Sequence, residues 1–233
     1  MVLRLGIQTA RQKRKPVHKT NLMIKLYADK GKASLTPHMI LNEIGRPFEL
    51  VLVDCDAGEQ RSEAYLRVNP HGRIPALAHD GLIVYETAAV VLHLVERFPE
   101  ADLAPPPGSH ERSLFYRWVA HLGCSIQPEM RAYFYAEQHA GGAACVADVK
   151  RMAERRIRAA FEVLDEQLGE GPFLLGDRYT AADPYLLMLV RWTRNMTNPA
   201  RTLTHIAAHA ERVLARPKIK LTLEIEGLAP PYV

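Results

Sequence analysis

The stretch from residue 68 to residue 87, VNPHGRIPALAHDGLIVYET, constrains the fold more than any other part of the chain. Its opening Asn-Pro-His-Gly is typical of a turn, because proline presets φ and glycine tolerates positive φ. A short strand is expected at 74–78, and Asp80-Gly81 is the two-residue signal of a β-hairpin that returns through residues 82–85. Glu86-Thr87 then opens a helical pattern. The stretch therefore predicts a turn, a hairpin and a helix in immediate succession.

The segment before this stretch predicts the first half of a mixed α/β unit. Residues 23–28 alternate between apolar and polar side chains, as in a strand, and residues 48–53 form a second strand-like run. Between them we expect a helix over 34–44, because Gly45 is a favoured residue for ending a helix. The predicted order of elements over residues 23–100 is β-α-β-α-β-β-α.

The chain beyond residue 100 is predicted to be wholly helical. The stiff run Pro105-Pro106-Pro107-Gly108 marks a domain boundary. Thr180 and Asp183 have the spacing of a capping box, which begins an apolar helix that reaches Trp192. The other predicted helices have apolar residues at helical spacing and cover 110–139, 146–168 and 217–228. The expected domains are a leader at 1–22, an α/β domain at 23–100 and an all-helical domain at 110–233.

Composition excludes several classes of protein. Hydrophobic residues make up 48% of the chain and charged residues 24%, which is ordinary for a globular protein. No apolar run approaches the ~20 residues of a membrane span, so we expect no membrane partner. Cys55, Cys124 and Cys145 are odd in number and have no metal-ligand spacing. They favour reduced thiols in the cytoplasm over a disulfide framework, and they predict no metal site.

Residues 1–22 differ from the rest of the chain in charge. They hold six basic and no acidic residues, which leaves a net charge of −2 on the remaining residues of a chain whose total is +4. We therefore expect no nucleic-acid surface on the folded part. The low hydrophobicity of the leader predicts disorder, or translated sequence upstream of the natural start. A targeting peptide or a nucleic-acid-binding arm is the alternative, although the apolar core of a secretory signal is missing.

Four segments in order resemble the cytosolic glutathione S-transferase family, and most of all its bacterial beta-like class. They are GKASLTPH at 31–38, VNPHGRIPAL at 68–77, the Glu-Thr pair at 86–87 and TAADPYLLMLVRW at 180–192. The resemblance implies an α/β plus all-α fold, with an N-terminal thioredoxin-like domain followed by the all-helical C-terminal domain of a glutathione transferase. It also implies a cytoplasmic homodimer that conjugates the glutathione thiolate to small hydrophobic electrophiles, in detoxification, with glutathione as co-substrate.

The resemblance assigns glutathione contacts to two segments of the opening stretch. Ile74, before a cis Pro75, is expected to offer its backbone to the cysteine part of glutathione. Glu86 and Thr87 are expected to hold the α-carboxylate of the γ-glutamyl group at a helix N-terminus. Unpaired N–H groups and the positive end of the helix dipole make such a position suitable for an anion.

The group that activates the thiol is where the chain departs from the class. The cysteine of the class Gly-x-Cys-Ser run is Ala33 here, so cysteine-dependent thiol transfer through that position is excluded. Ser34 is the first candidate donor, with a plain helix N-cap as the alternative role, and the backbone N–H groups of Ala33 and Ser34 could share the task. Tyr27 is the second candidate, with a core tyrosine as the alternative. A donor beside the sulfur would stabilise the thiolate and lower the thiol pKa.

The expected contribution of the helical domain is a glutathione contact and an electrophile pocket. Gln127 matches the histidine position of the class and can hydrogen-bond but cannot act as a base near neutral pH. His121, on the same helix, is more typical of a packing residue. Trp192 and Tyr133 are the predicted pocket residues, because aromatic walls suit a flat apolar substrate. The remaining candidates are Phe134 and Tyr135 for the pocket and His71 and Arg73 for the glutathione carboxylates.

Two rival functions share the same pocket. The first is another glutathione-dependent reaction, such as that of a peroxidase, an isomerase or an ether-cleaving lyase. The second is a binding or scaffold protein that keeps the fold without catalysis, which Ala33 and Gln127 favour. A substrate panel discriminates the first, and glutathione binding without turnover would indicate the second.

Overall fold

The computed structural model describes residues 23–233, so the predictions for the leader at 1–22 lie outside the described residues. The first part of the chain forms a four-stranded sheet in the order β2-β1-β3-β4. β1 pairs parallel to β2 and antiparallel to β3, and β3 pairs antiparallel to β4. The strands are β1 (Ile24–Ala28), β2 (Phe48–Leu52), β3 (Ala76–His79) and β4 (Leu82–Tyr85). This topology is that of the predicted thioredoxin-like domain.

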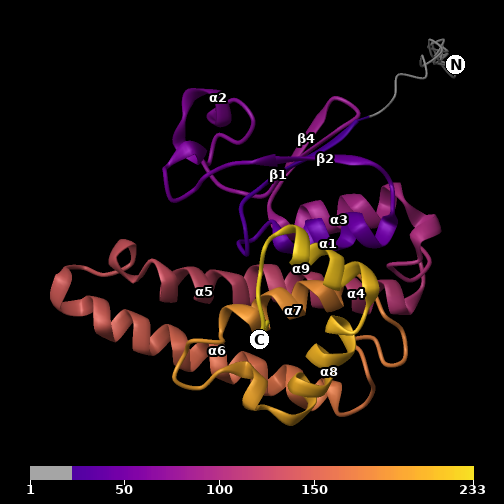
Figure 1. Cartoon of the computed structure of the whole chain (residues 1–233). Helices are drawn as coiled ribbons and strands as arrows, with labels where there is room; N and C mark the ends of the chain where they lie inside the picture. The colour runs from indigo at the N-terminus through magenta and orange to yellow at the C-terminus, as the bar shows by residue number, and fades with distance from the viewer. Residues whose placement is uncertain (1–22) are drawn as a thin grey trace, which may run out of the picture.

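Helices cover both faces of the sheet (Figure 1). The short helix α2 (Glu63–Leu66) lies on one side, while α1 (Leu35–Ile44) and α3 (Thr87–Arg97) lie on the side of the helical domain. Ile24, Leu26 and Ala28 alternate with less buried residues along β1, as expected for a strand with one face in the core. Two short 3-10 turns belong to this part of the chain, Glu59–Arg61 and Pro99–Ala101.

The predicted turn chemistry is confirmed. Asp80 and Gly81 both have positive φ, 56° and 78°, which is the conformation that a tight hairpin needs. Gly45 ends α1 in the left-handed region at φ 73°, and its N–H donates to the carbonyl of Leu41. The Ile74–Pro75 peptide bond is cis, as the resemblance implied.

The rest of the described chain is helical. The helices are α4 (His110–His121), α5 (Gln127–Phe134), α6 (Val146–Leu168), α7 (Ala182–Trp192), α8 (Thr204–Leu214) and α9 (Pro217–Ile225). The predicted helix over 110–139 is wrong in two respects, because a π-helix (Leu122–Ile126) interrupts it and it ends at Phe134. Pro128 has no N–H to bond a carbonyl of the preceding turn, which accounts for a break in the α-helical ladder there. The final helix ends at Ile225, before the predicted residue 228.

The predicted bond from Asp183 back to Thr180 is present before α7, but the N-cap of the helix is Ala181 and not the predicted Thr180. The Asp183 carboxylate accepts the Thr180 N–H at 2.7 Å, and it also accepts the Leu174 N–H at 3.1 Å. Asp183 lies 3.0 Å from Nε2 of His209, and both side chains are fully buried. α7 is buried from Ala182 to Arg191, so it forms the centre of the helical domain.

One hydrophobic core runs through both parts of the molecule. α1 packs against α7 and α9, and α3 packs against α4, which places the sheet directly over the helical domain (Figure 1). Within residues 23–233, no helix is both long and apolar enough to cross a membrane. The same residues contain no cluster of three or more His, Cys, Asp or Glu side chains arranged to hold a metal ion.

Candidate functional site

Strand order brings three separate segments of the sequence to one edge of the sheet, namely the edge formed by the ends of strands β1, β3 and β4. Tyr27 of β1 pairs with Ala76 of β3, and Ala76 pairs with Tyr85 of β4. β1 and β4 end where β3 begins. The turn after β1, the cis Ile74–Pro75 bond and the Glu86–Thr87 pair therefore lie along one edge, above the helical domain.

The turn from Asp29 to Ser34 is closed by its own serine. The Ser34 hydroxyl donates to the Asp29 carbonyl oxygen at 2.9 Å and accepts the Asp29 N–H at 3.0 Å. Ser34 is fully buried, and its side chain does not cap α1. The hydroxyl proton is thus used inside the turn, and this geometry argues against the predicted role of Ser34 as the donor to a thiolate.

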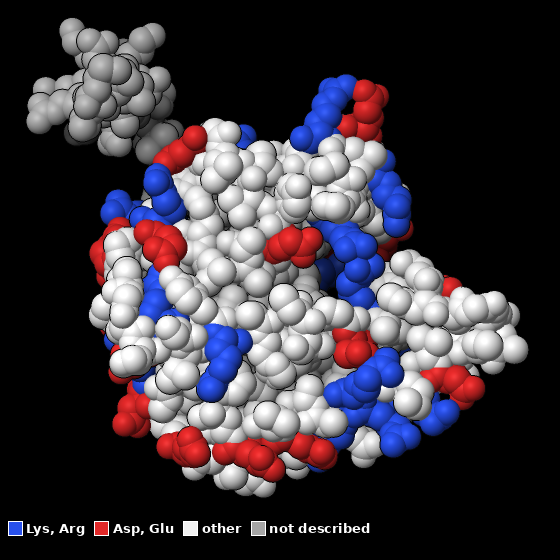
Figure 2. Space-filling model, turned by 180° about the vertical axis from the view of Figure 1, so that it is seen from behind, with Lys and Arg blue, Asp and Glu red and all other residues white. Residues whose placement is uncertain are grey.

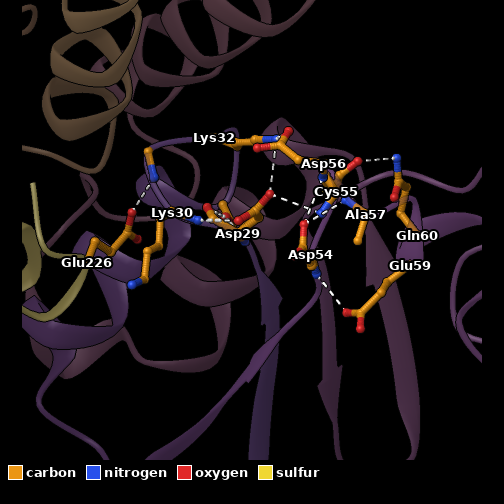
Figure 3. A network of polar contacts seen from close by, with 12 residues as sticks. Asp29, Lys30, Lys32, Asp54, Cys55, Asp56, Ala57, Glu59, Gln60 and Glu226 are labelled. Atoms are coloured by element: carbon orange, nitrogen blue, oxygen red, sulfur yellow. Dashed lines mark hydrogen bonds and ion pairs between the residues drawn. The ribbon is translucent and has the colours of Figure 1, made fainter.

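The same turn is bound to the loop after β2 (Figure 3). The Lys32 ammonium lies 2.6 Å from Asp56 and 3.1 Å from Asp29, and Asp29 also accepts the Cys55 N–H at 3.2 Å. Burial acts to lower the pKa of Lys32, but the hydrogen bonds to the two carboxylates outweigh it and raise that pKa. Lys32 is therefore a fixed cation beside Ala33.

Cys55 is an inert thiol despite its place in this network. Burial, followed by the negative charge of Asp29, raises its pKa to about 12. A thiol with that pKa stays protonated near neutral pH and is a poor nucleophile. Cys55 cannot replace the sulfur that is missing at Ala33.

Trp192 of α7 joins the helical domain to the turn. Its indole Nε1–H donates to the Gly31 carbonyl oxygen at 3.0 Å. Phe134 packs edge-on against Trp192 at 6.3 Å between ring centroids, and Tyr133 packs against Phe134 at 5.2 Å. Phe134 remains 48% exposed, so the row presents an apolar surface that begins beside the turn. The two predicted pocket residues, Trp192 and Tyr133, belong to this row.

Gln127 is engaged within the protein. Its Nε2 donates to Thr87 Oγ1 at 3.3 Å, and its Oε1 accepts the hydroxyl proton of Tyr185. The Thr87 side chain is buried, and the chain enters α3 through Glu86 at φ 71°. Gln127 is thus a link between α3 and α7, and the direct glutathione contact predicted for it would need an amide that already has two partners.

Arg131 is a candidate site residue that the sequence reasoning missed. It lies one turn after Gln127 on α5. Burial and the nearby Arg73 guanidinium lower its pKa, while Tyr135 and Glu86 act in the opposite direction. Arg73 and Glu86 therefore lie near enough to Arg131 to influence its charge. The spacing of four residues from Gln127 places Arg131 on the same helix face, and this was the available signal.

The surface at this junction is hollowed and carries basic side chains. Figure 2 shows a recess between the two lobes of the molecule, with Lys and Arg side chains and a smaller number of Asp and Glu side chains at its rim and a largely uncharged lobe beside it. A recess of this charge favours an anionic ligand with an apolar neighbour.

The remaining predicted residues lie elsewhere. Tyr27 points to the sheet face that carries α2, where its ring packs against Tyr65 at 5.8 Å between centroids. His71 packs against Tyr85, and His121 packs against Trp118. Burial lowers the pKa of His121, which fits a packing role.

Comparison with known proteins identifies the family. Residues 23–96 match the model of the glutathione S-transferase N-terminal domain, and residues 130–216 match that of the C-terminal domain. The chain is 29% identical to glutathione S-transferase GST-4.5 of Xanthomonas campestris pv. campestris over 88% of this chain and 100% of that protein. It superposes on BphK, a bacterial transferase solved as a ternary complex, with a TM-score of 0.78 and 30% identity over 88% of this chain and 100% of that one.

The chain belongs to the glutathione S-transferase family. A bacterial beta-class transferase from Sphingomonas chungbukensis also superposes, with a TM-score of 0.77 and 28% identity over 88% of this chain and 100% of that one. The predicted resemblance to the bacterial beta-like class is confirmed.

Proposed function

We propose that the protein binds glutathione along the sheet edge and transfers its thiolate to a hydrophobic electrophile held against Trp192 and Tyr133. One observation supports this most directly: Ala33–Ser34, Ile74–Pro75 and Glu86–Thr87 converge on one edge, and the aromatic row begins beside it. In the reaction, the sulfur forms a bond to the electrophilic carbon. A leaving group departs with its electron pair, or the electrons move into a conjugated acceptor, and the thiol proton goes to solvent.

Charge complementarity supports the orientation of glutathione. The γ-glutamyl group carries a carboxylate and an ammonium on one carbon. The start of α3, Arg73 and Arg131 suit the carboxylate, and Glu86 suits the ammonium. Binding would neutralise two guanidinium groups that repel each other in the free protein.

Backbone groups are the proposed activators of the thiol. The amides of Ala33 and Ser34 precede Leu35, the first residue of α1, where N–H groups have no acceptor within the helix. Neither needs a side chain, so the loss of the class cysteine leaves them in place. The Lys32 ammonium adds positive charge near the same point.

A scaffold without catalysis is the second candidate. It is favoured by Ala33 and by the engagement of Ser34 and Gln127 inside the protein, which together leave no side-chain donor of the class free at the sulfur position.

The deciding experiment is a titration of protein-bound glutathione in which thiolate absorbance is followed against pH. A bound thiol pKa well below the value of a free thiol, about 8.5, would establish an activated thiolate. Binding with an unshifted pKa would favour the scaffold. Absence of glutathione binding would overturn the proposed function.

We further propose that the protein works as a cytoplasmic homodimer. The family membership supports the dimer, and three free cysteines support a reducing compartment. Sedimentation that gives a monomer at working concentration would contradict the dimer.

A further inference from the structure

Both backbone polar atoms of Gly31 are held by the helical domain. The Gly31 N–H donates to Glu226 Oε2 at 2.7 Å, and the Gly31 carbonyl accepts the Trp192 indole N–H at 3.0 Å. Figure 3 shows Glu226 reaching the turn from the C-terminal end of the chain. The two partners come from the end of α9 and the end of α7, 195 and 161 residues further along the sequence.

These two hydrogen bonds fix Gly31, which is the one glycine of the turn from Asp29 to Ser34. Gly31 has φ +66°, in the left-handed region, and only its own φ and ψ separate the two held atoms. With both atoms fixed, the Gly31–Lys32 peptide group has a set direction. The next peptide group, which carries the Ala33 amide, is held as well, because the Lys32 carbonyl accepts the Leu35 N–H at 3.0 Å. Leu228 packs over the glycine, since a Cβ there would meet its side chain at 3.4 Å.

Glu226 is itself immobilised. Its other oxygen lies 2.8 Å from Nδ1 of His38, and the side chains of the two residues are 3% and 1% exposed. His38 lies on α1, one turn after Ser34. A carboxylate is rarely buried without hydrogen bonds, because it loses its hydration. This one is bonded on both oxygens to groups on either side of Ala33.

We propose that Glu226 and Trp192 are positioning residues for the thiol of glutathione. They act through Gly31 and set the backbone donors of the Ala33–Ser34 turn against the sulfur. This inference rests on the proposed function, because it assumes that the sulfur lies at that turn. It makes the activating turn a structure shared by both domains, in which the helical domain orients the donors.

The experiment uses Glu226→Ala, Glu226→Gln and Trp192→Phe in the full-length protein. Each variant is measured for glutathione affinity by calorimetry and for the pKa of the bound thiol by thiolate absorbance. Glu226→Ala removes a charge-assisted bond, so we expect affinity to fall about tenfold and the bound thiol pKa to rise. Trp192→Phe keeps an aromatic ring but loses the indole N–H donor together with the five-membered ring that carries it. We expect a loss of about fivefold in affinity and a rise of the bound thiol pKa.

Glu226→Gln provides the conservative rescue. Its amide oxygen can accept the Gly31 N–H, and its NH₂ can donate to Nδ1 of a neutral His38, so most of the affinity should return. Glu224→Ala is the matched control, because Glu224 is an exposed glutamate on the same helix. It should leave both measurements at the wild-type values.

The outcomes distinguish a role in positioning the thiol donors from a role in the stability of the fold alone. Lower thermal stability with unchanged affinity and unchanged thiol pKa in Glu226→Ala and Trp192→Phe would overturn the inference. If Glu226→Ala does not fold, Trp192→Phe decides alone, because it leaves the buried carboxylate in place. Failure of the wild-type protein to bind glutathione would instead remove the proposed function and this inference with it.

Discussion

Arg131 carries a positive charge at a place that disfavours it in the free protein. Burial and the neighbouring Arg73 both lower its pKa. A bound carboxylate would stabilise the charged guanidinium and raise the pKa of Arg131 again. We therefore expect Arg131→Gln to weaken glutathione binding by about tenfold, the usual effect of removing a charge-assisted hydrogen bond, without lowering the stability of the free protein.

Calorimetry and thermal unfolding test this prediction together. Arg155→Gln is the control, because Arg155 is an exposed arginine on α6 and should bind glutathione as the wild type does. An Arg131→Gln variant with wild-type affinity would show that the guanidinium does not face the ligand.

Single residues were predictable where their role depends on neighbours in the sequence. Pro75 and Glu86 were found from a turn, a hairpin and a helix start that follow one another directly. The partners of Gln127 lie 40 and 58 residues away, and no local pattern indicates them. The same holds for the bond between Ser34 and Asp29, since it depends on how the turn closes and not on which residues it contains.

At the scale of elements, a histidine pair joins the β3–β4 hairpin to α3. Nδ1 of His79 lies 2.9 Å from Nε2 of His93, so one ring donates and the other accepts, and the accepting ring must be neutral. Burial lowers the pKa of both histidines below the ordinary value of 6.5. The charged groups that face the pair are Asp80, which acts to raise these pKa values, and Arg97, which acts to lower them.

The sign of the pH dependence follows from these directions. As pH falls below about 6.5, the unfolded chain takes up protons on these histidines and the folded chain does not. Stability is therefore fully present above that pH and is lost as pH falls toward the folded-state pKa values. The loss is at most about 1.4 kcal/mol per pH unit for each proton.

Urea unfolding of the wild type and of His93→Gln from pH 8 to pH 5 measures this effect. The variant should lose stability less steeply with acid, while His121, whose pKa is also lowered by burial, keeps part of the slope. The difference in unfolding free energy between the two proteins at pH 8 gives the cost of the lost packing alone. Equal slopes in the two proteins would contradict the proton linkage.

Elements were predictable to the extent that their ends carry local signals. α6 was expected over 146–168 and has those bounds, because glycines precede it and Gly169 follows it. The π-helix between α4 and α5 could not be seen, since its residues have ordinary helical spacing. The position of the π-helix can be explained only from the residues of other helices that pack against it.

At the scale of the whole molecule, that π-helix packs directly against α3 of the sheet domain. A Cβ at Gly123 would lie 2.9 Å from Cβ of Ala88 on α3 and 3.1 Å from the hydroxyl oxygen of Tyr185 on α7. Tyr185 also donates to Gln127, which bonds Thr87 at the start of α3. The first turn of α3, with its proposed glutathione contacts, thus depends on a glycine in the other domain.

Gly123→Ala should therefore separate the domains by a small amount. Overpacking at this seam, the contact of Gly123 with Ala88 and Tyr185, should cost about 1–3 kcal/mol of unfolding free energy. The resulting shift of α3 should also lower glutathione affinity. Gly141→Ala is the matched control, because no atom would lie within 4 Å of its added Cβ, and its stability should stay within about 0.5 kcal/mol of the wild type. Denaturant unfolding and calorimetry on both variants distinguish the cases. If Gly123→Ala loses stability but keeps its affinity, the seam holds the domains together without setting the start of α3, and the glutathione site is confined to the sheet domain.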